Sequence, residues 1–310
     1  MKLSFCLLLG CLLASVVNAK ELPADQPIPT HADISYGPHE RHVLDFFKAD
    51  SDKPTPVLVF IHGGGWLHGN KEKEAHIYRN SLLPMLKQNG ISAAFINYRF
   101  TTEAILPAPV FDAARAIQFL RYKAEQLNID KSRIAATGGS AGGCTSLWLA
   151  THDDLADPNA TDPVLRESTR LCGALVGVAQ TTIEPATIRA WIGERGISHM
   201  MIRQAGGFKS NKEMDANYAT KADLYREFSP VTHLTKDDPP MLLRYHQRLD
   251  DQKEGIHHAL FGFHFMNHAM QVGAPCYLEL RQHPDIFPGS PSVNDFLLNV
   301  LIDRPLPSAK

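Results

Sequence analysis

Cysteine is scarce in this sequence, and what the chain lacks excludes several classes of protein. Only five cysteines occur in 310 residues, and two of them, Cys6 and Cys11, fall near the N-terminus. The other three, Cys144, Cys172 and Cys276, lie in apolar stretches and permit at most one disulfide, so we expect buried free thiols.

The chain also lacks an excess of charge of either sign. Its 31 Lys and Arg nearly balance 33 Asp and Glu, for a net charge of −2. Without a basic patch we expect no nucleic-acid partner.

A hydrophobic run that could direct the chain to a membrane occurs only at the N-terminus. Residues 1–19 contain one lysine, an apolar run from Leu3 to Val17 and a small-residue end at Val17-Asn18-Ala19. This pattern is typical of a secretory signal peptide and is too short for a spanning helix with proper flanks. We therefore expect a secreted or periplasmic protein without a membrane span. Lipid anchoring at Cys11 is the less favoured alternative, because the apolar run continues beyond that residue.

The rest of the chain alternates strand-like and helix-like patterns. Residues 20–32 are rich in proline and predict an extended lead-in, and residues 33–310 are enough for one large domain. Strands alternating with helices favour an α/β fold, with a mainly parallel sheet covered by helices on both faces. From short apolar runs and helical periodicity, we expect strands at 33–37, 43–48, 57–61, 91–98, 129–134, 171–179, 241–245 and 276–281, and helices at 72–89, 109–127, 143–151, 256–272 and 293–302.

The chain is organised around a G-x-S-x-G sequence, Gly138-Gly139-Ser140-Ala141-Gly142. It lies between a strand-like run at 133–137 and a helix-like run at 143–151. A serine on a strained turn from strand to helix has its hydroxyl exposed, and glycines two residues before and after it let the backbone close tightly. Ser140 is therefore a candidate nucleophile. On its own, the motif is equally compatible with tight packing or with anion binding at a helix N-terminus.

A second glycine-rich motif, His62-Gly63-Gly64-Gly65-Trp66, follows the buried strand at 57–61. Three glycines at the end of a strand leave backbone N–H groups free to point at an oxyanion. Losing one such donor typically lowers the rate by about 10²–10³-fold. We expect His62 to orient this loop through hydrogen bonds and not to act as a base, because it precedes the oxyanion glycines.

With these two motifs in this order, the sequence resembles the α/β-hydrolase family, in particular its hormone-sensitive-lipase-like enzymes and its bacterial carboxylesterases or feruloyl esterases of the BD-FAE type. The matching motifs are HGGGW and GGSAGG, and the resemblance extends over roughly residues 33–301. It implies a serine hydrolase that cleaves carboxylic esters through an acyl-enzyme, without a cofactor. The implied substrates are small-molecule or polysaccharide-linked esters. The implied oxyanion hole consists of the amides of Gly64, Gly65 and Ala141.

In such a fold the nucleophile is followed by an acid after the next-to-last strand and by a histidine after the last strand. His283 is the only histidine after the strand at 276–281, so we expect it to be the general base. The turn after the strand at 241–245 offers Asp250, the expected acid, with Asp251 as the alternative. The sequence around these residues departs from the usual His-Gly turn and His-Gly-Phe motif of the family.

Two further stretches bear on function. Residues 182–228 lose the alternation of strands and helices, and the resemblance implies an inserted lid there, with a merely surface-covering excursion as the alternative. A histidine-rich stretch contains His257, His258, His264 and His268. It lacks the glutamate of a zinc-binding H-E-x-x-H motif, and its aromatic neighbours indicate packing, so we expect no metal site.

Two other functions remain open. The departures near Asp250 and His283 fit a binding protein of the same fold that has lost a working acid and base. A peptidase on the same scaffold is a third hypothesis. Labelling of Ser140 by a fluorophosphonate would distinguish an activated serine from an inactive one. The sequence leaves the oligomeric state open.

Overall fold

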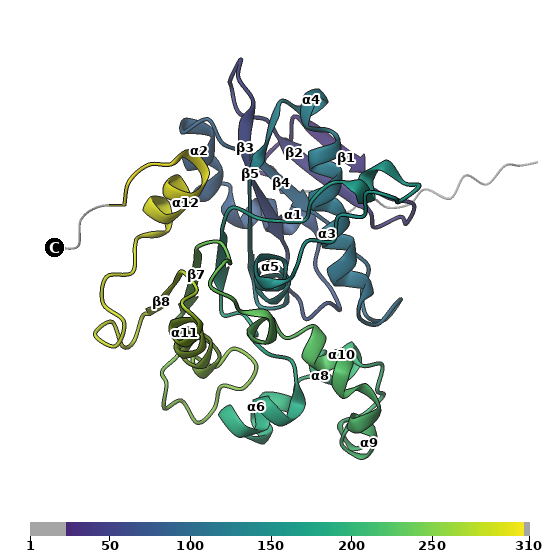
Figure 1. The fold of residues 1–310 in the computed structure, drawn as a ribbon, viewed down its shortest axis with the longest axis vertical. Coiled ribbons are helices and arrows are strands. Elements are labelled where there is room, and N and C mark those ends of the chain that lie inside the picture. Colours follow the sequence, from purple (N-terminus) through teal and green to yellow (C-terminus); the bar gives the residue numbers. More distant parts are fainter. Residues whose placement is uncertain (1–22, 307–310) are drawn as a thin grey trace, which may run out of the picture.

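The computed structural model describes residues 23–306 and contains one sheet of eight strands (Figure 1). The strand order is β1-β2-β4-β3-β5-β6-β7-β8. The pairs β1–β2 and β2–β4 are antiparallel, and all other neighbours are parallel. The mainly parallel α/β arrangement predicted from the sequence is thus confirmed. The strands are β1 (His31–Ser35), β2 (Val43–Phe47), β3 (Thr55–Ile61), β4 (Ser92–Ile96), β5 (Ile129–Gly139), β6 (Ala174–Gly177), β7 (Met241–Tyr245) and β8 (Cys276–Leu280).

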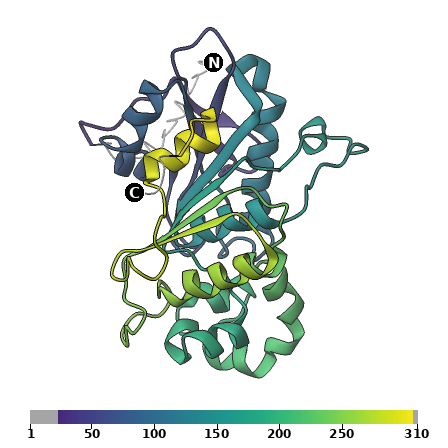
Figure 2. The same cartoon turned by 60° about the vertical axis from the view of Figure 1, so that its left-hand side comes forward.

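Helices cover both faces of the sheet because its central strands are apolar on both sides (Figure 2). All residues of β3 are buried, and alternate side chains point to opposite faces. Leu58 and Phe60 pack in one cluster with α1, α2 and α12. Val59 and Ile61 belong to the larger cluster on the other face, with α3, α5 and α11. These helices are α1 (Lys71–Tyr78), α2 (Leu82–Gln88), α3 (Ala108–Tyr122), α5 (Ala141–Thr151), α11 (Leu260–Val272) and α12 (Val293–Ile302).

Three expected helices differ from the prediction. The helix expected at 72–89 is divided into α1 and α2, because Pro84 lacks the N–H of a continuous helix and its ring would clash with the carbonyl group of Asn80. The helix expected at 109–127 ends at Tyr122, and a short α4 (Ala124–Leu127) follows. The helix expected at 256–272 begins only at Leu260, so the four residues before it form a loop.

Between β6 and β7 the chain leaves the sheet over residues 182–228, the excursion expected to be a lid, which we call the lid segment. Its helices lie beyond the carboxyl ends of the parallel strands (Figure 1). Met201, Met214 and Tyr225 of this segment are fully buried in the same hydrophobic cluster as α5. The lid segment is therefore packed as part of the core. Its helices are α6 (Pro185–Trp191), α7 (Glu194–Ile197), α8 (Met200–Ala205), α9 (Asn211–Asn217) and α10 (Ala222–Glu227).

Some expectations fall on residues that the structure does not describe. The signal peptide predicted at 1–19, with Cys11, lies outside the described residues, as do the first residues of the lead-in. Within residues 23–306, no helix combines the length and the apolar character that crossing a membrane requires. Cys144, Cys172 and Cys276 are free, and burial raises the pKa of the Cys172 and Cys276 thiols to about 12.

Candidate active site

Ser140 stands at the turn where β5 ends and α5 begins. Its backbone φ of 54° lies in the left-handed region, which residues with a side chain rarely adopt. Close approach fixes this turn, because a Cβ atom on Gly138 or Gly142 would overlap the carbonyl oxygen of Ile61 in β3. The Ser140 amide donates to the Gly177 carbonyl group at 2.9 Å. This is the strained strand-to-helix turn that the motif predicts, and it leaves the serine side chain partly exposed.

The glycine loop after β3 lies beside this turn. A Cβ atom on Gly63 would come within 2.8 Å of the Gly139 carbonyl oxygen and within 3.6 Å of the Ser140 Cβ. Gly64 and Gly65 have φ values of 102° and 65°, which glycine adopts without strain. Among the described residues, the amides of Gly64 and Gly65 donate to no acceptor. Both N–H groups therefore remain available to an oxyanion.

Ala141 and His62 flank the same space. Ala141 is the first residue of α5, and the first N–H groups of a helix have no acceptor within the helix. His62 Nδ1 donates to the Gly63 carbonyl group at 2.8 Å, and its ring stacks on Tyr98 with centroids 4.2 Å apart. Burial lowers the pKa of His62 to about 4. A neutral, hydrogen-bonded His62 agrees with the expected role as an anchor of the glycine loop.

On the other side of Ser140 lies His257. Its Nε2 atom is 2.9 Å from Ser140 Oγ, which is within reach for proton transfer. His257 belongs to the loop that precedes α11, and this loop brings the imidazole to the end of β5. The structure thus places a strained serine in direct contact with a histidine, which is an arrangement that nucleophilic catalysis requires.

Two side chains hold the loop of His257 in place. The fully buried Gln180 donates from Nε2 to the Ile256 carbonyl group at 2.7 Å. Glu254 Oε1 accepts from the amides of Gly255 and His257 at 2.9 and 3.1 Å. Burial lowers the pKa of His257 below the usual 6.5, and the charge of Glu254 opposes this shift. The imidazole is therefore unprotonated at neutral pH, as a general base must be.

This geometry differs from the predicted pairing of Ser140 with His283. The His283 Nε2 atom accepts a hydrogen bond from the Leu249 amide at 3.1 Å. The lone pair that a general base would use is therefore already engaged. His283 follows the last strand, as expected, but its ring joins the turn after β8 to the turn after β7.

The expected acids are also engaged elsewhere. Asp250 is exposed and forms a bidentate ion pair with Arg248 at 2.8 and 3.0 Å, and this pairing lowers the pKa of the Asp250 carboxyl group. Asp251 Oδ1 accepts from two backbone amides at 2.8 and 3.1 Å. Among residues 23–306, neither carboxylate hydrogen-bonds to His257. The structure therefore brings neither expected acid to the pair of Ser140 and His257.

His257 was not among the predicted site residues, because the histidine-rich stretch was expected to form a helix whose histidines pack. That interpretation holds for His264, which stacks on Trp191 with centroids 4.5 Å apart. Gly255 is a local sign that the helix begins later than predicted, because a Cβ atom at this position would overlap the carbonyl oxygen of Arg195. A glycine required at this point indicates a tight loop, and His257 lies two residues later.

Comparison with known proteins finds a matching family and relatives whose names describe esterases. The sequence matches the BD-FAE family over residues 44–252, more than half of the chain. It is 30% identical over 222 residues to the probable carboxylic ester hydrolase LipM of Mycobacterium tuberculosis, in a match that covers 68% of this chain and 46% of LipM. The chain spans about half the length of the curated relatives it matches.

Solved structures show the same architecture over more of the chain. An acetyl ester-xyloside bifunctional hydrolase from Caldicellulosiruptor lactoaceticus is 25% identical, with a TM-score of 0.60 over 80% of this chain and 78% of the other. A truncated carbohydrate esterase from gut microbiota has a TM-score of 0.68 over 91% of this chain and 99% of the other. At 19% identity, the second likeness concerns the fold alone.

Proposed function

Because this chain belongs to the BD-FAE family and has the α/β-hydrolase fold, we propose that it hydrolyses carboxylic esters through an acyl-enzyme. The observation that carries this proposal is the 2.9 Å contact between Ser140 Oγ and His257 Nε2. The contact lies at a strained turn beside the glycine loop, whose Gly64 and Gly65 amides have no acceptor within residues 23–306. A nucleophile, a base and oxyanion donors are the parts that acyl transfer needs.

The proposed reaction has two steps. Ser140 Oγ attacks the ester carbonyl carbon while its proton passes to His257 Nε2. The tetrahedral intermediate then expels the alcohol, which takes that proton and leaves an acyl group on Ser140. In the second step, water attacks the acyl carbon and gives a proton to His257. The carboxylic acid departs as Ser140 regains its proton.

The amides of Gly64, Gly65 and Ala141 are proposed to hold the oxyanion of both tetrahedral intermediates. The support is that Ala141 directly follows Ser140, that a Cβ atom on Gly63 in the same glycine loop would lie 3.6 Å from Ser140 Cβ, and that the Gly64 and Gly65 amides have no acceptor among the described residues. Donors that are already oriented need no rearrangement when negative charge develops, so they lower the barrier more than they tighten substrate binding.

The role of the third triad member is proposed for Glu254. In the described part of the chain, no carboxylate oxygen hydrogen-bonds to the His257 ring, but the charge of Glu254 favours its protonated form. Glu254 also fixes the backbone of His257 through its amide. It would thus stabilise the imidazolium that forms during both steps, in place of Asp250.

Carbohydrate-linked esters with short acyl groups are the proposed substrates. The likeness to an acetyl ester-xyloside bifunctional hydrolase supports this class. The lid segment lies against the oxyanion loop, because a Cβ atom on Gly65 would lie 3.4 Å from Met201 Cβ and 3.6 Å from His199 Cε1. Side chains of the lid segment are therefore placed to contact a bound ester.

The test compares single variants on p-nitrophenyl acetate and on an acetylated xylo-oligosaccharide. Ser140→Ala and His257→Ala should each lower kcat by roughly 10⁴–10⁶-fold, and the double variant should be no worse than either, because the two residues act as one unit. His283→Ala serves as the matched control and should retain kcat close to wild type. The reverse result, with His283→Ala inactive and His257→Ala active, would restore the arrangement predicted from the sequence.

A fluorophosphonate probe and an aminoacyl anilide address the two other functions. An esterase should be labelled at Ser140 and should cleave esters much faster than anilides. Absence of labelling in the folded wild-type protein would favour a binding protein of the same fold. Faster cleavage of the anilide would favour a peptidase.

Export is proposed on the N-terminal sequence alone, residues 1–19. The expected product is a chain that begins at Lys20, secreted or periplasmic. Expression of the full chain in a bacterial host, followed by fractionation and N-terminal sequencing, checks this. Recovery of the intact N-terminus in the cytoplasm contradicts it, and a lipid on Cys11 would indicate anchoring.

A further inference from the structure

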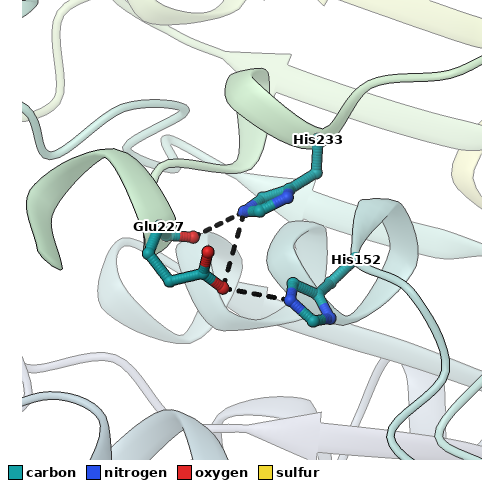
Figure 3. Close-up of side chains that lie close together, drawn as sticks. All are labelled: His152, Glu227 and His233. Atoms are coloured by element: carbon teal, nitrogen blue, oxygen red, sulfur yellow. Dashed lines mark hydrogen bonds and ion pairs between the residues drawn. The ribbon is translucent and has the colours of Figure 1, made fainter. Parts of the chain in front are cut away.

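A second cluster of polar side chains lies at the opposite end of α5 from Ser140. His152 directly follows α5, Glu227 ends α10, and His233 ends a 3-10 turn, Pro230–His233. Figure 3 shows the three side chains pointing toward one another. His152 Nε2 is 3.0 Å from Glu227 Oε1, and His233 Nε2 is 3.9 Å from the same oxygen. Three groups that bind metals therefore converge from three segments, with ligand atoms all within 4.8 Å of one another.

The ring of His152 is oriented as in a metal ligand. Its Nδ1 atom donates to the Asp153 carbonyl group at 2.8 Å, which leaves Nε2 directed at Glu227. Metal-binding histidines typically make such a bond with their other ring nitrogen. Trp148 stacks on the ring with centroids 4.1 Å apart and restricts its rotation. The position of Nε2 is thus fixed before any ion binds.

His233 can join the cluster through a small change. Its Nε2 atom donates to the Glu227 carbonyl group at 2.6 Å, and Trp148 Nε1 donates to the same oxygen at 2.8 Å. If Nε2 exchanges its proton for a metal ion, the carbonyl group keeps the bond from Trp148. Zinc bonds of about 2.0–2.2 Å place tetrahedral ligand atoms about 3.4 Å apart. The separations of 3.0 and 3.9 Å lie on either side of that value.

We propose that His152, Glu227 and His233 form a zinc site that ties the lid segment to α5. Two imidazoles and one carboxylate suit Zn²⁺ better than the hard ions Mg²⁺ and Ca²⁺. A water molecule would complete the tetrahedron. The ligands join the last helix of the lid segment to the helix that begins beside Ser140. A bound ion therefore holds the returning end of the lid segment against the core.

The test uses the full chain after dialysis against a chelator, with Co²⁺ and Zn²⁺ as probes. We expect one Co²⁺ per chain, with the visible absorption of a tetrahedral site and quenching of Trp148 fluorescence that Zn²⁺ reverses. Zn²⁺ should also raise the Tm, because an ion that binds only the folded chain stabilises it. Failure to bind a single Co²⁺ with these signals would overturn the proposal.

Variants locate the ion. Glu227→Gln keeps the size of the side chain and removes its charge, so Co²⁺ affinity should fall by at least about tenfold. His152→Ala combined with His233→Ala should abolish the absorption. His268→Ala, an exposed histidine on α11, is the control and should change nothing. If the double variant binds as wild type does, the ion sits at other histidines and the proposal is wrong. If it does not fold, Glu227→Gln decides alone.

Discussion

His257 titrates in surroundings that act on its charge in opposite directions. Burial lowers its pKa below 6.5, and the Glu254 carboxylate opposes that shift. Because the base must be neutral to accept the Ser140 proton, kcat/KM should fall on the acid side at a pH below 6.5. Glu254→Gln removes the charge that favours the imidazolium. The acid limb should therefore move to a lower pH, and kcat at neutral pH should fall as the imidazolium loses stabilisation.

The measurement is kcat/KM against pH for wild type and Glu254→Gln. Glutamine retains an oxygen that can accept from the amide of His257, so the loop should keep its conformation. Glu125→Gln, an exposed residue on α4, is the control. An acid limb that moves to a higher pH in Glu254→Gln would contradict the proposed action of this carboxylate.

Gly64 and Gly65 differ in what a methyl group would meet. At Gly64 a Cβ atom would overlap the carbonyl oxygen of His68, whereas at Gly65 the nearest atom would be 3.4 Å away. Gly64→Ala should therefore lower the Tm and the activity together. Gly65→Ala, strained only by its φ, should lower kcat by about 10²-fold or more, with a smaller change in KM. Thermal unfolding and steady-state kinetics of both variants check this, and a Gly65→Ala effect confined to KM would remove that amide from the oxyanion hole.

At the scale of elements, the position of the loop before α11 depends on the buried side-chain amide of Gln180. Gln180 Nε2 donates to the Ile256 carbonyl group, next to His257. Gln180→Leu should lower kcat by about 10²-fold, because a displacement of about 1 Å can have that effect, and KM should change little. Gln118 is a matched control, since its buried amide donates to the Glu167 carbonyl group away from the site. Gln118→Leu should cost stability, about 1–3 kcal/mol, without loss of kcat.

Thermal unfolding and kinetics of both glutamine variants separate the two effects. Equal losses of kcat in Gln180→Leu and Gln118→Leu would mean that neither acts through His257.

The elements that the sequence predicted well are those whose signal is local. β7 and α12 have the expected bounds, because turn residues and periodicity mark their ends. The turn at Ser140 and the glycine loop were also predictable, because each is a strand followed by glycines that close approach requires. The partner of Ser140 was not predictable in this way. His257 reaches it through a contact across 117 positions of sequence, and although Gly255 marks a tight loop nearby, helical periodicity does not distinguish the histidine that meets Ser140 from those that pack.

At the scale of the whole molecule, acid should weaken a buried ionic network that joins the residue before β2 and the loop after β4 to helix α3. Asp112 on α3 accepts from Arg99 at 2.6 Å and pairs with His42 at 3.0 Å. Burial would raise the pKa of Asp112, but its bonds to Arg99 and His42 outweigh this and lower it from 3.8 to about 2. A depressed pKa contributes stability above pH 4 that is lost as the pH falls toward 2, here about 2 kcal/mol.

Asp112→Asn should therefore lower the free energy of unfolding at neutral pH by about 2 kcal/mol, because it removes the buried charge that pairs with Arg99 and His42. The difference from wild type should shrink between pH 4 and pH 2. Urea unfolding at several pH values measures this, with the exposed Asp50→Asn as control. A difference that is constant over this range would show that the ionised carboxylate is not the source of the stability.

The two ends of the lid segment meet at Ser229, whose hydroxyl oxygen accepts from the Ile183 amide at 2.9 Å and from the Thr182 hydroxyl at 3.1 Å. The excursion between β6 and β7 therefore starts and finishes at nearly the same place. Lengthening a loop between fixed ends costs little, roughly 0.6 kcal/mol for each doubling. Evolution, or an engineer grafting a lid from a relative, can exchange this segment while the register of β6 and β7, and with it the turn that carries Ser140, is left unchanged. The exchanged segment must keep the side chains that fill the core beside α5, such as Met201 and Tyr225, and a residue in the place of Glu227, whose carbonyl group accepts from Trp148.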